Sequence, residues 1–120
     1  MSAKDDLVYV AHMLDVARQI QAKVAGLDRA GFDADENLQL AVTHLIQIIG
    51  EAARLVSDGF RDQHDVIPWH QITGMRHRIV HDYLNIDFDI VWEVAHREVE
   101  KLVTQLEALT QAGETNSDGE

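Results

Sequence analysis

The sequence has no cysteine, a single proline and seven glycines among its 120 residues. The lack of cysteine excludes disulfide bridges and thiolate metal sites. Proline and glycine are too rare for the many turns of an all-β sandwich, but their number is normal for helices joined by short loops. A chain of this length forms one domain and can fold without cross-links. The composition therefore favours a single helical domain.

Basic residues are also scarce. Ten lysines and arginines stand against 21 aspartates and glutamates, so the formal net charge is −11 and the isoelectric point is about 4.9. Such an acidic surface repels the phosphates of nucleic acids at long range. Any role with nucleic acid therefore requires a local basic site.

Long apolar runs are missing as well, because no stretch approaches the roughly 18 apolar residues that are needed to cross a bilayer. Near the start of the chain, Asp5 and Asp6 stand where a signal peptide would carry basic residues. We therefore expect a cytoplasmic protein that does not associate with a membrane.

Over most of the chain, apolar residues recur at steps of three and four, which is the period of an amphipathic helix. The pattern predicts helices over residues 5–25, 33–58, 68–83 and 88–112. Asp33, with Glu36 three residues later, resembles a capping box, and the polar residues 61–65 form either a brief helical turn or a loop. Gly74 weakens the third helix by roughly 1 kcal/mol relative to alanine. The expected fold is all-α, an up-down bundle of four to five helices.

The end of the chain differs in composition, because residues 113–120 contain no apolar side chain. We expect these residues to form a disordered acidic tail. The predicted domain organisation is one helical domain over residues 1–112, followed by this tail.

The segment 74–83, Gly-Met-Arg-His-Arg-Ile-Val-His-Asp-Tyr, is unlike the rest of the chain. It contains two of the ten basic residues and two of the seven histidines. On an acidic protein this is a local positive site, and histidine is the residue type whose ordinary pKa lies nearest to neutral pH.

Helix geometry separates the residues of this segment. On a regular helix, Tyr83 returns to within about 20° of Arg76, whereas His81 lies roughly 140° away from Arg76. Arg76 and His81 therefore meet only if the helix unwinds near Asp82, or if a second copy of the chain places its own segment opposite. Symmetric dimers pair the same surface of both subunits, so the second arrangement is geometrically simple.

An imidazole and a guanidinium in one cleft suit the cleavage of an RNA phosphodiester. The imidazole can accept the proton of the ribose 2′-hydroxyl, and the imidazolium can protonate the departing oxygen. Arginine is permanently charged and can stabilise the extra negative charge on the phosphorus in the transition state. This chemistry needs neither a metal ion nor a cofactor.

The order Arg76, four residues, His81, one residue, Tyr83 resembles the signature of HepT-like toxins of the HEPN superfamily, and His77 fits the polar position that follows the arginine. The flanking sequences are also similar to that family. They are Ile-Ile-Gly-Glu-Ala-Ala at 48–53, Ile-Pro-Trp at 67–69 and Asp-Ile-Val-Trp-Glu at 89–93. The resemblance covers residues 7–109, nearly the whole chain.

The resemblance implies a HEPN-like helical bundle that forms homodimers with the two motifs facing each other. It also implies a metal-independent ribonuclease that is the toxin of a type II toxin–antitoxin pair. The expected partner is a small (MNT-type) nucleotidyltransferase antitoxin, which in some systems attaches AMP to the motif tyrosine. By this resemblance Arg76 and His81 would be catalytic, and Tyr83 would be the site of AMPylation. We expect supporting roles for His77, Arg78 and Glu51.

Two other interpretations remain open from the residues alone. The strong negative charge favours a non-catalytic helical subunit that binds a substrate or docks onto a nucleotidyltransferase. His77 and His81 also have the spacing of a two-histidine metal pair, for which Asp82 or His70 could supply a third ligand.

Overall fold

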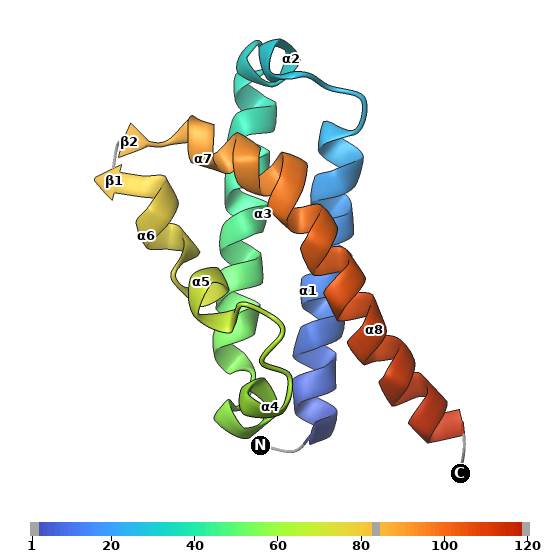
Figure 1. Ribbon diagram of the computed structural model, residues 1–120. Coiled ribbons are helices and arrows are strands. Elements are labelled where there is room, and N and C mark those ends of the chain that lie inside the picture. Colours follow the sequence, from blue (N-terminus) through green and yellow to red (C-terminus); the bar gives the residue numbers. More distant parts are fainter. Residues whose placement is uncertain (1–2, 83–84, 119–120) are drawn as a thin grey trace.

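The computed structural model describes residues 3–82 and 85–118, with the side chains of residues 5–82 and 85–111. Its body consists of the long helices α1 (Ala3–Val24), α3 (Glu36–Leu55) and α8 (Val99–Asp118), with α1 packed against both α3 and α8 (Figure 1). The all-α prediction is confirmed. The other elements, in chain order, are α2 (Arg29–Asp33), α4 (Asp58–Gln63), α5 (Trp69–Thr73), α6 (Met75–Ile79), β1 (Val80–Asp82), β2 (Asn85–Ile86), α7 (Phe88–Glu93) and the π-helix η1 (Val94–Glu98).

The connection between α1 and α3 is shaped by two aspartates that cap helices. Asp28 accepts a hydrogen bond of 2.8 Å from the Gly31 N–H at the start of α2. Asp35 accepts one of 3.0 Å from the Leu38 N–H at the start of α3. The capping box predicted at Asp33 is therefore wrong, because Asp33 ends α2 and Asp35 supplies the carboxylate that satisfies the free N–H groups of α3.

The hydrophobic core lies where α1, α3 and the continuous helical segment α7–η1–α8 meet (Figure 1). Helix α3 contacts α1, α2, α5, α6 and α7, so it lies at the centre of the fold. The largest fully buried side chains include Met13, Ile20, Phe32, Ile67, Ile79 and Leu106. Among the described residues, no helix is both long and apolar enough to cross a membrane.

A buried carboxylate joins the start of α1 to the start of α4. Asp6 is only 2% exposed, and its two oxygens accept hydrogen bonds of 2.7 Å each from the backbone N–H and the hydroxyl of Ser57. The Ser57 hydroxyl in turn caps α4, accepting a hydrogen bond from the Phe60 N–H. The polar segment after α3 was expected to be either a helical turn or a loop. The helical turn is correct, and this helix, α4, begins at Asp58.

The predicted helix over residues 68–83 is interrupted at Gly74 and wrong beyond Ile79. Gly74 ends α5 and begins α6, and at Val80 the backbone becomes extended (φ −114°, ψ 108°). Val80 then pairs with Ile86 in a two-stranded antiparallel hairpin, and the Asp87 N–H donates a hydrogen bond of 2.7 Å to the Ile79 carbonyl. The β-branched side chains at Ile79 and Val80 favour this change, since they lose more rotamer freedom in a helix than in a strand.

The last helix continues beyond its predicted end at residue 112. Helical backbone extends to Asp118, through residues that were expected to be disordered. Polar helices can extend beyond the core, because the backbone satisfies its own hydrogen bonds. The division of the chain at residue 112 stays a prediction.

Candidate functional site

The hairpin β1–β2 positions His81 beside a carboxylate. His81 lies on β1 with 54% of its side chain exposed, and its Nε2 is 3.0 Å from Oδ2 of Asp87. Asp87 follows β2 directly and caps α7, because its other oxygen accepts a hydrogen bond of 3.2 Å from the Ile90 N–H. One aspartate thus begins a helix and orients the imidazole.

The contact with His81 also determines which ring nitrogen is available for chemistry. The hydrogen bond from His81, followed by that from the Ile90 N–H, lowers the pKa of Asp87 below its ordinary value. An ionised carboxylate can only accept hydrogen bonds, so Nε2 of His81 must carry the hydrogen. In the neutral ring this leaves the lone pair on Nδ1, which is therefore the nitrogen that can accept a proton from a substrate.

Arg76 lies on α6 and faces a different part of the surface. Its guanidinium is exposed and has no hydrogen bond or ion pair within the described part of the chain. It lines a pocket of about 270 Å³ between α3 and the α5–α6 segment, which we call the α3–α6 pocket. The main polar groups around this pocket are His44, Gln47, Glu51, Arg54 and Arg76.

Arg76 thus lines the α3–α6 pocket, whereas His81 lies on the hairpin beside Asp87. The helix does unwind before Asp82, which was one of the two alternatives considered from the sequence, but the unwinding begins at Val80. No hydrogen bond or ion pair connects Arg76 with His81 among the residues that the structure describes. Tyr83, the third residue of the predicted motif, lies outside the described residues.

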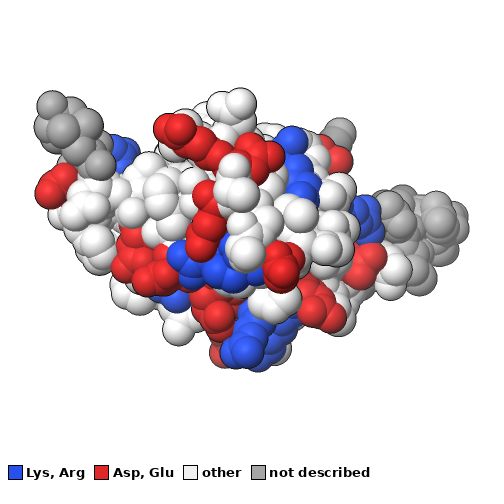
Figure 2. All heavy atoms as spheres, turned by 90° about the horizontal axis from the view of Figure 1, so that it is seen from above, with Lys and Arg blue, Asp and Glu red and all other residues white. Residues whose placement is uncertain are grey.

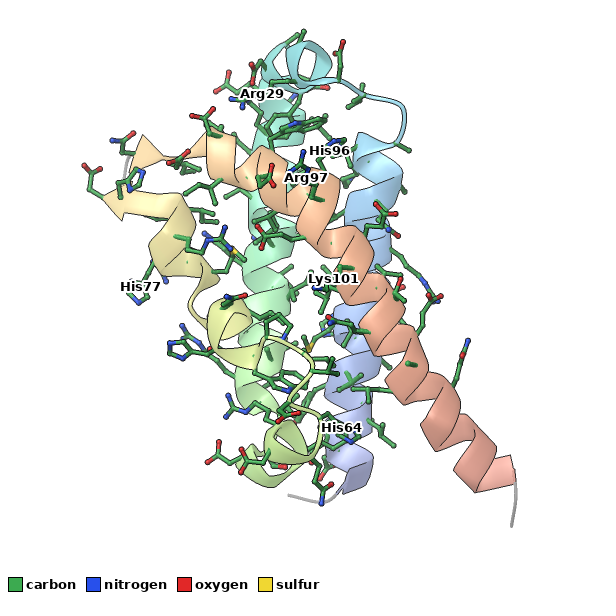
Figure 3. All side chains as sticks on the ribbon, in the orientation of Figure 1. Arg29, His64, His77, His96, Arg97 and Lys101 are labelled. Atoms are coloured by element: carbon green, nitrogen blue, oxygen red, sulfur yellow. The ribbon has the colours of Figure 1, made fainter. Side chains whose placement is uncertain are left out.

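The three supporting residues have different surroundings. Arg78 makes two hydrogen bonds, of 3.0 and 3.1 Å, with the carboxylate of Glu98 on η1, and this contact raises the pKa of Arg78. His77 is exposed and points outward from α6, away from α3 (Figure 3). Glu51 lines the α3–α6 pocket, where it lies 3.6 Å from Arg54. Arg78 therefore links α6 to the π-helix, whereas His77 and Glu51 are accessible to a ligand.

A larger pocket, of about 490 Å³, lies between α3, α5 and the η1–α8 segment. Its walls are mainly apolar, with Ile49, Ile72 and Leu102 among them, and the Arg78–Glu98 pair lies at its edge. Neither Arg76 nor His81 lines this larger pocket. The RNA cleavage predicted from these two residues is therefore not assigned to it.

The alternative of a metal site formed by two histidines required His77 and His81 to lie on the same face of one helix. His77 and His81 do not share a helix face, because α6 ends at Ile79. Within the described ranges, no group of three or more His, Asp and Glu side chains is arranged to hold a metal ion.

Charge is distributed unevenly over the surface. At the end of the molecule that carries α2, acidic and basic side chains lie next to one another (Figure 2). Arg29, for example, pairs with both Asp33 and Asp89 at 2.8 Å. Arg76, by contrast, has no acidic partner within the described ranges, so its charge can attract an anion.

Sequence reasoning missed three contributors to the site. Nothing in the local pattern marks Asp87 as a site residue, and only the hairpin β1–β2 brings it to His81, six residues earlier in the chain. His44 and Arg54 lie ten residues apart on α3, so they share a helix face with Glu51. Only the crossing of α5–α6 over α3 reveals that this face meets Arg76.

Comparisons with known proteins identify the family of the chain. The family model described as "Ribonuclease HepT-like" matches residues 13–109. A protein of Caldanaerobacter subterraneus subsp. tengcongensis named "Putative RNase" is 31% identical over 103 residues, which cover 86% of this chain and 92% of that protein. The "Probable ribonuclease HepT" of Thermococcus cleftensis is 28% identical over 108 residues, which cover 90% of this chain and 96% of that protein. No solved structure matches the chain significantly. The chain therefore belongs to the HepT-like ribonucleases of the HEPN superfamily.

Proposed function

We propose that this ribonuclease is the toxin of a type II toxin–antitoxin pair, and that Arg76 and His81 cut RNA without a metal ion. The observation that carries the proposal is an exposed imidazole held by the ionised Asp87, in a chain whose motif also supplies an arginine with no ion pair among the described residues. Both groups are accessible to a polymer as large as RNA.

The proposed reaction uses the free nitrogen of His81. Nδ1 accepts the proton of the ribose 2′-hydroxyl, and the 2′-oxygen attacks the adjacent phosphorus. The 5′-oxygen of the next nucleotide leaves and takes a proton from an imidazolium. Arg76 holds the negative charge that accumulates on the phosphoryl oxygens. The products are a 2′,3′-cyclic phosphate and a 5′-hydroxyl end.

A homodimer is part of this proposal. Arg76 faces the α3–α6 pocket, whereas His81 lies on the hairpin. No contact among the described residues brings the two side chains together around one phosphate. A two-fold axis beside α6 and β1 would place the Arg76 of one protomer opposite the His81 of its partner. The catalytic cleft would then be shared between the two chains.

The proposed antitoxin is a small nucleotidyltransferase that silences the toxin by attaching AMP to Tyr83. Only Asp82 separates Tyr83 from His81 along the chain, so a nucleotide there would add bulk and negative charge next to the catalytic ring. RNA phosphate would be repelled from the same place. Co-expression with a nucleotidyltransferase, followed by mass measurement of the intact toxin, tests this step.

The decisive test is RNA cleavage in the presence of a chelator. We expect the parent protein to cut, Arg76→Ala and His81→Ala to lose at least about a hundredfold in rate, and the matched surface variant His12→Ala to cut normally. His12 is exposed on α1 and lines neither of the two pockets described above. Equal cleavage by all four proteins would contradict the assignment of the site.

A non-catalytic docking subunit is the second candidate, and the net charge of −11 favours it. That interpretation predicts tight binding to a nucleotidyltransferase but no cleavage of RNA by the parent protein. Growth arrest on expression, abolished by His81→Ala, would contradict it.

A further inference from the structure

The α3–α6 pocket has a defined wall on each side. On α3, the side chains that face it follow the helical period, with His44, Gln47, Glu51 and Arg54 on one side of the helix. Arg76 stands opposite, on α6. These residues come from two separate parts of the sequence.

Close approach of two backbones fixes the depth of this pocket. A Cβ atom placed on Gly50 would lie 3.2 Å from the carbonyl oxygen of Ile72, so α5 rests directly on α3 at this point. Nearby, Nη2 of Arg54 donates a hydrogen bond of 3.2 Å to the Thr73 carbonyl. The geometry around Arg76 is therefore held from α3.

The charges in the pocket favour an anion. Two guanidinium groups, Arg54 and Arg76, line it together with one carboxylate, Glu51. The positive excess stands out on a molecule with a net charge of −11. Arg76 makes no ion pair within the described chain, and the nearest oxygen of Glu51 is 3.6 Å from Arg54. A phosphate that bridged the two arginines would gain charge-assisted hydrogen bonds from both.

His44 and Gln47 supply the features that recognise a nucleobase. Both line the pocket beside Ile48, and neither makes a hydrogen bond to another described residue. Proteins that read single-stranded RNA stack unpaired bases on flat side chains such as histidine and bind the base edges with polar groups. An amide and a carboxylate, Gln47 and Glu51, are available for such edges.

We propose that the α3–α6 pocket binds the nucleotide of the RNA substrate whose phosphate is cut. Its phosphate lies between Arg54 and Arg76, and its base lies against His44 and Gln47. A volume of about 270 Å³ lies just below the roughly 300–1,000 Å³ of ordinary small-ligand pockets, so the pocket has room for no more than one nucleotide of the RNA. This inference rests on the proposed role of Arg76 in RNA cleavage, and it assigns His44 as a residue that positions the substrate and determines sequence preference.

The first test measures binding without cleavage. In a His81→Ala background, we measure the dissociation constants for single-stranded RNA oligonucleotides of about ten nucleotides, made of adenosine, cytidine or uridine. We expect His44→Ala to weaken binding by about five- to tenfold, unequally among the three oligonucleotides, because it removes a stacking surface. Gln47→Ala should change the preference among bases, whereas His12→Ala should change nothing.

The second test uses the cleaving enzyme. His44→Ala should raise KM and shift the preferred cutting position, with a smaller effect on kcat, while the thermal midpoint stays that of the parent. Unchanged binding and unchanged cutting positions in His44→Ala would overturn the inference. If the parent binds RNA in a His44-dependent way but never cuts it, the pocket assignment stands and the proposed catalytic function fails.

Discussion

At the residue scale, the pairing of His81 with Asp87 controls the proposed chemistry. A carboxylate that is hydrogen-bonded to one ring nitrogen holds the ring in one orientation and leaves the other nitrogen as the base. The same carboxylate caps α7, so the position of the base is tied to the start of a helix. Motion of the ring and fraying of α7 are therefore coupled.

Asp87→Asn tests this pairing. Asparagine can still cap α7, but it is neutral and no longer holds the hydrogen on Nε2 by charge. We expect kcat for RNA cleavage to fall by roughly ten- to a hundredfold, less than the loss caused by removing the imidazole itself. Rates measured together with the thermal midpoint separate this effect from unfolding. A variant that cuts at the parental rate would show that Asp87 acts only as a cap.

The lowered pKa of Asp87 also predicts how stability depends on pH. In the unfolded chain an aspartate has a pKa of about 3.9, so the folded state, with its lower pKa, is favoured by this group above that pH. The contribution is lost as the pH falls through the folded pKa. The difference in thermal midpoint between the parent and Asp87→Asn should therefore be present at neutral pH and shrink below about pH 4. A constant difference down to acid unfolding would contradict this account.

At the element scale, the position of α5 and α6 depends on Gly50. The Cβ of an alanine there would meet the Ile72 carbonyl, a backbone atom that cannot rotate away. Alanine is favoured over glycine in a helix by about 1 kcal/mol, but crowding of this kind costs about 1–3 kcal/mol. The gain in helix propensity and the cost of crowding oppose each other. We expect the crowding to be larger, because the atom that the new Cβ meets belongs to the backbone.

Gly50→Ala should accordingly lower the free energy of unfolding by about 1 kcal/mol and weaken RNA binding at the α3–α6 pocket. Gly59→Ala is the matched control, because a Cβ on Gly59 has no neighbour within 4 Å. That control should be neutral or slightly stabilising. Denaturant unfolding of both variants measures the difference, and a stabilised Gly50→Ala would show that α5 can move aside without cost.

A second contact between elements is the buried carboxylate of Asp6. Replacement by alanine removes two hydrogen bonds to a charged acceptor and leaves the Ser57 N–H without its partner. We expect Asp6→Ala to lose about 2–3 kcal/mol of folding free energy. Ser57→Ala removes one of these hydrogen bonds and the cap of α4, so a double-mutant cycle should show coupling between the two positions. Additive effects would indicate that the two groups act independently.

At the scale of the whole molecule, the proposed homodimer, in which Arg76 from one protomer meets His81 from the other, predicts complementation between inactive variants. In a dimer that combines Arg76→Ala with His81→Ala, one of the two shared clefts retains both functional groups. Random mixing should therefore restore about a quarter of the parental activity. Purified variants that are unfolded and refolded together, then assayed on RNA, provide the measurement. Two inactive variants that stay inactive together would place both groups in a site formed by one chain.

The periodicity of the sequence was sufficient for the helical framework. Residues that recur every three or four positions, such as Val42, Ile46 and Ile49, identify a buried helix face without reference to any other part of the chain. The order of Arg76 and His81 likewise indicated the family before any contact was known. Both signals are local, so a single sequence contains them in full.

Tertiary structure alone decided how the motif is displayed. The helix over residues 68–83 looked continuous by periodicity, yet it ends at Ile79 because Val80 finds a strand partner in Ile86. The same hairpin brings His81 to Asp87, and the close approach of α5 to Gly50 brings Arg76 to the face of α3. Each of these arrangements depends on contacts between residues that the local pattern treats separately. The sequence by itself therefore determined the helices and the chemical groups of this protein, whereas packing between distant segments decided which groups meet.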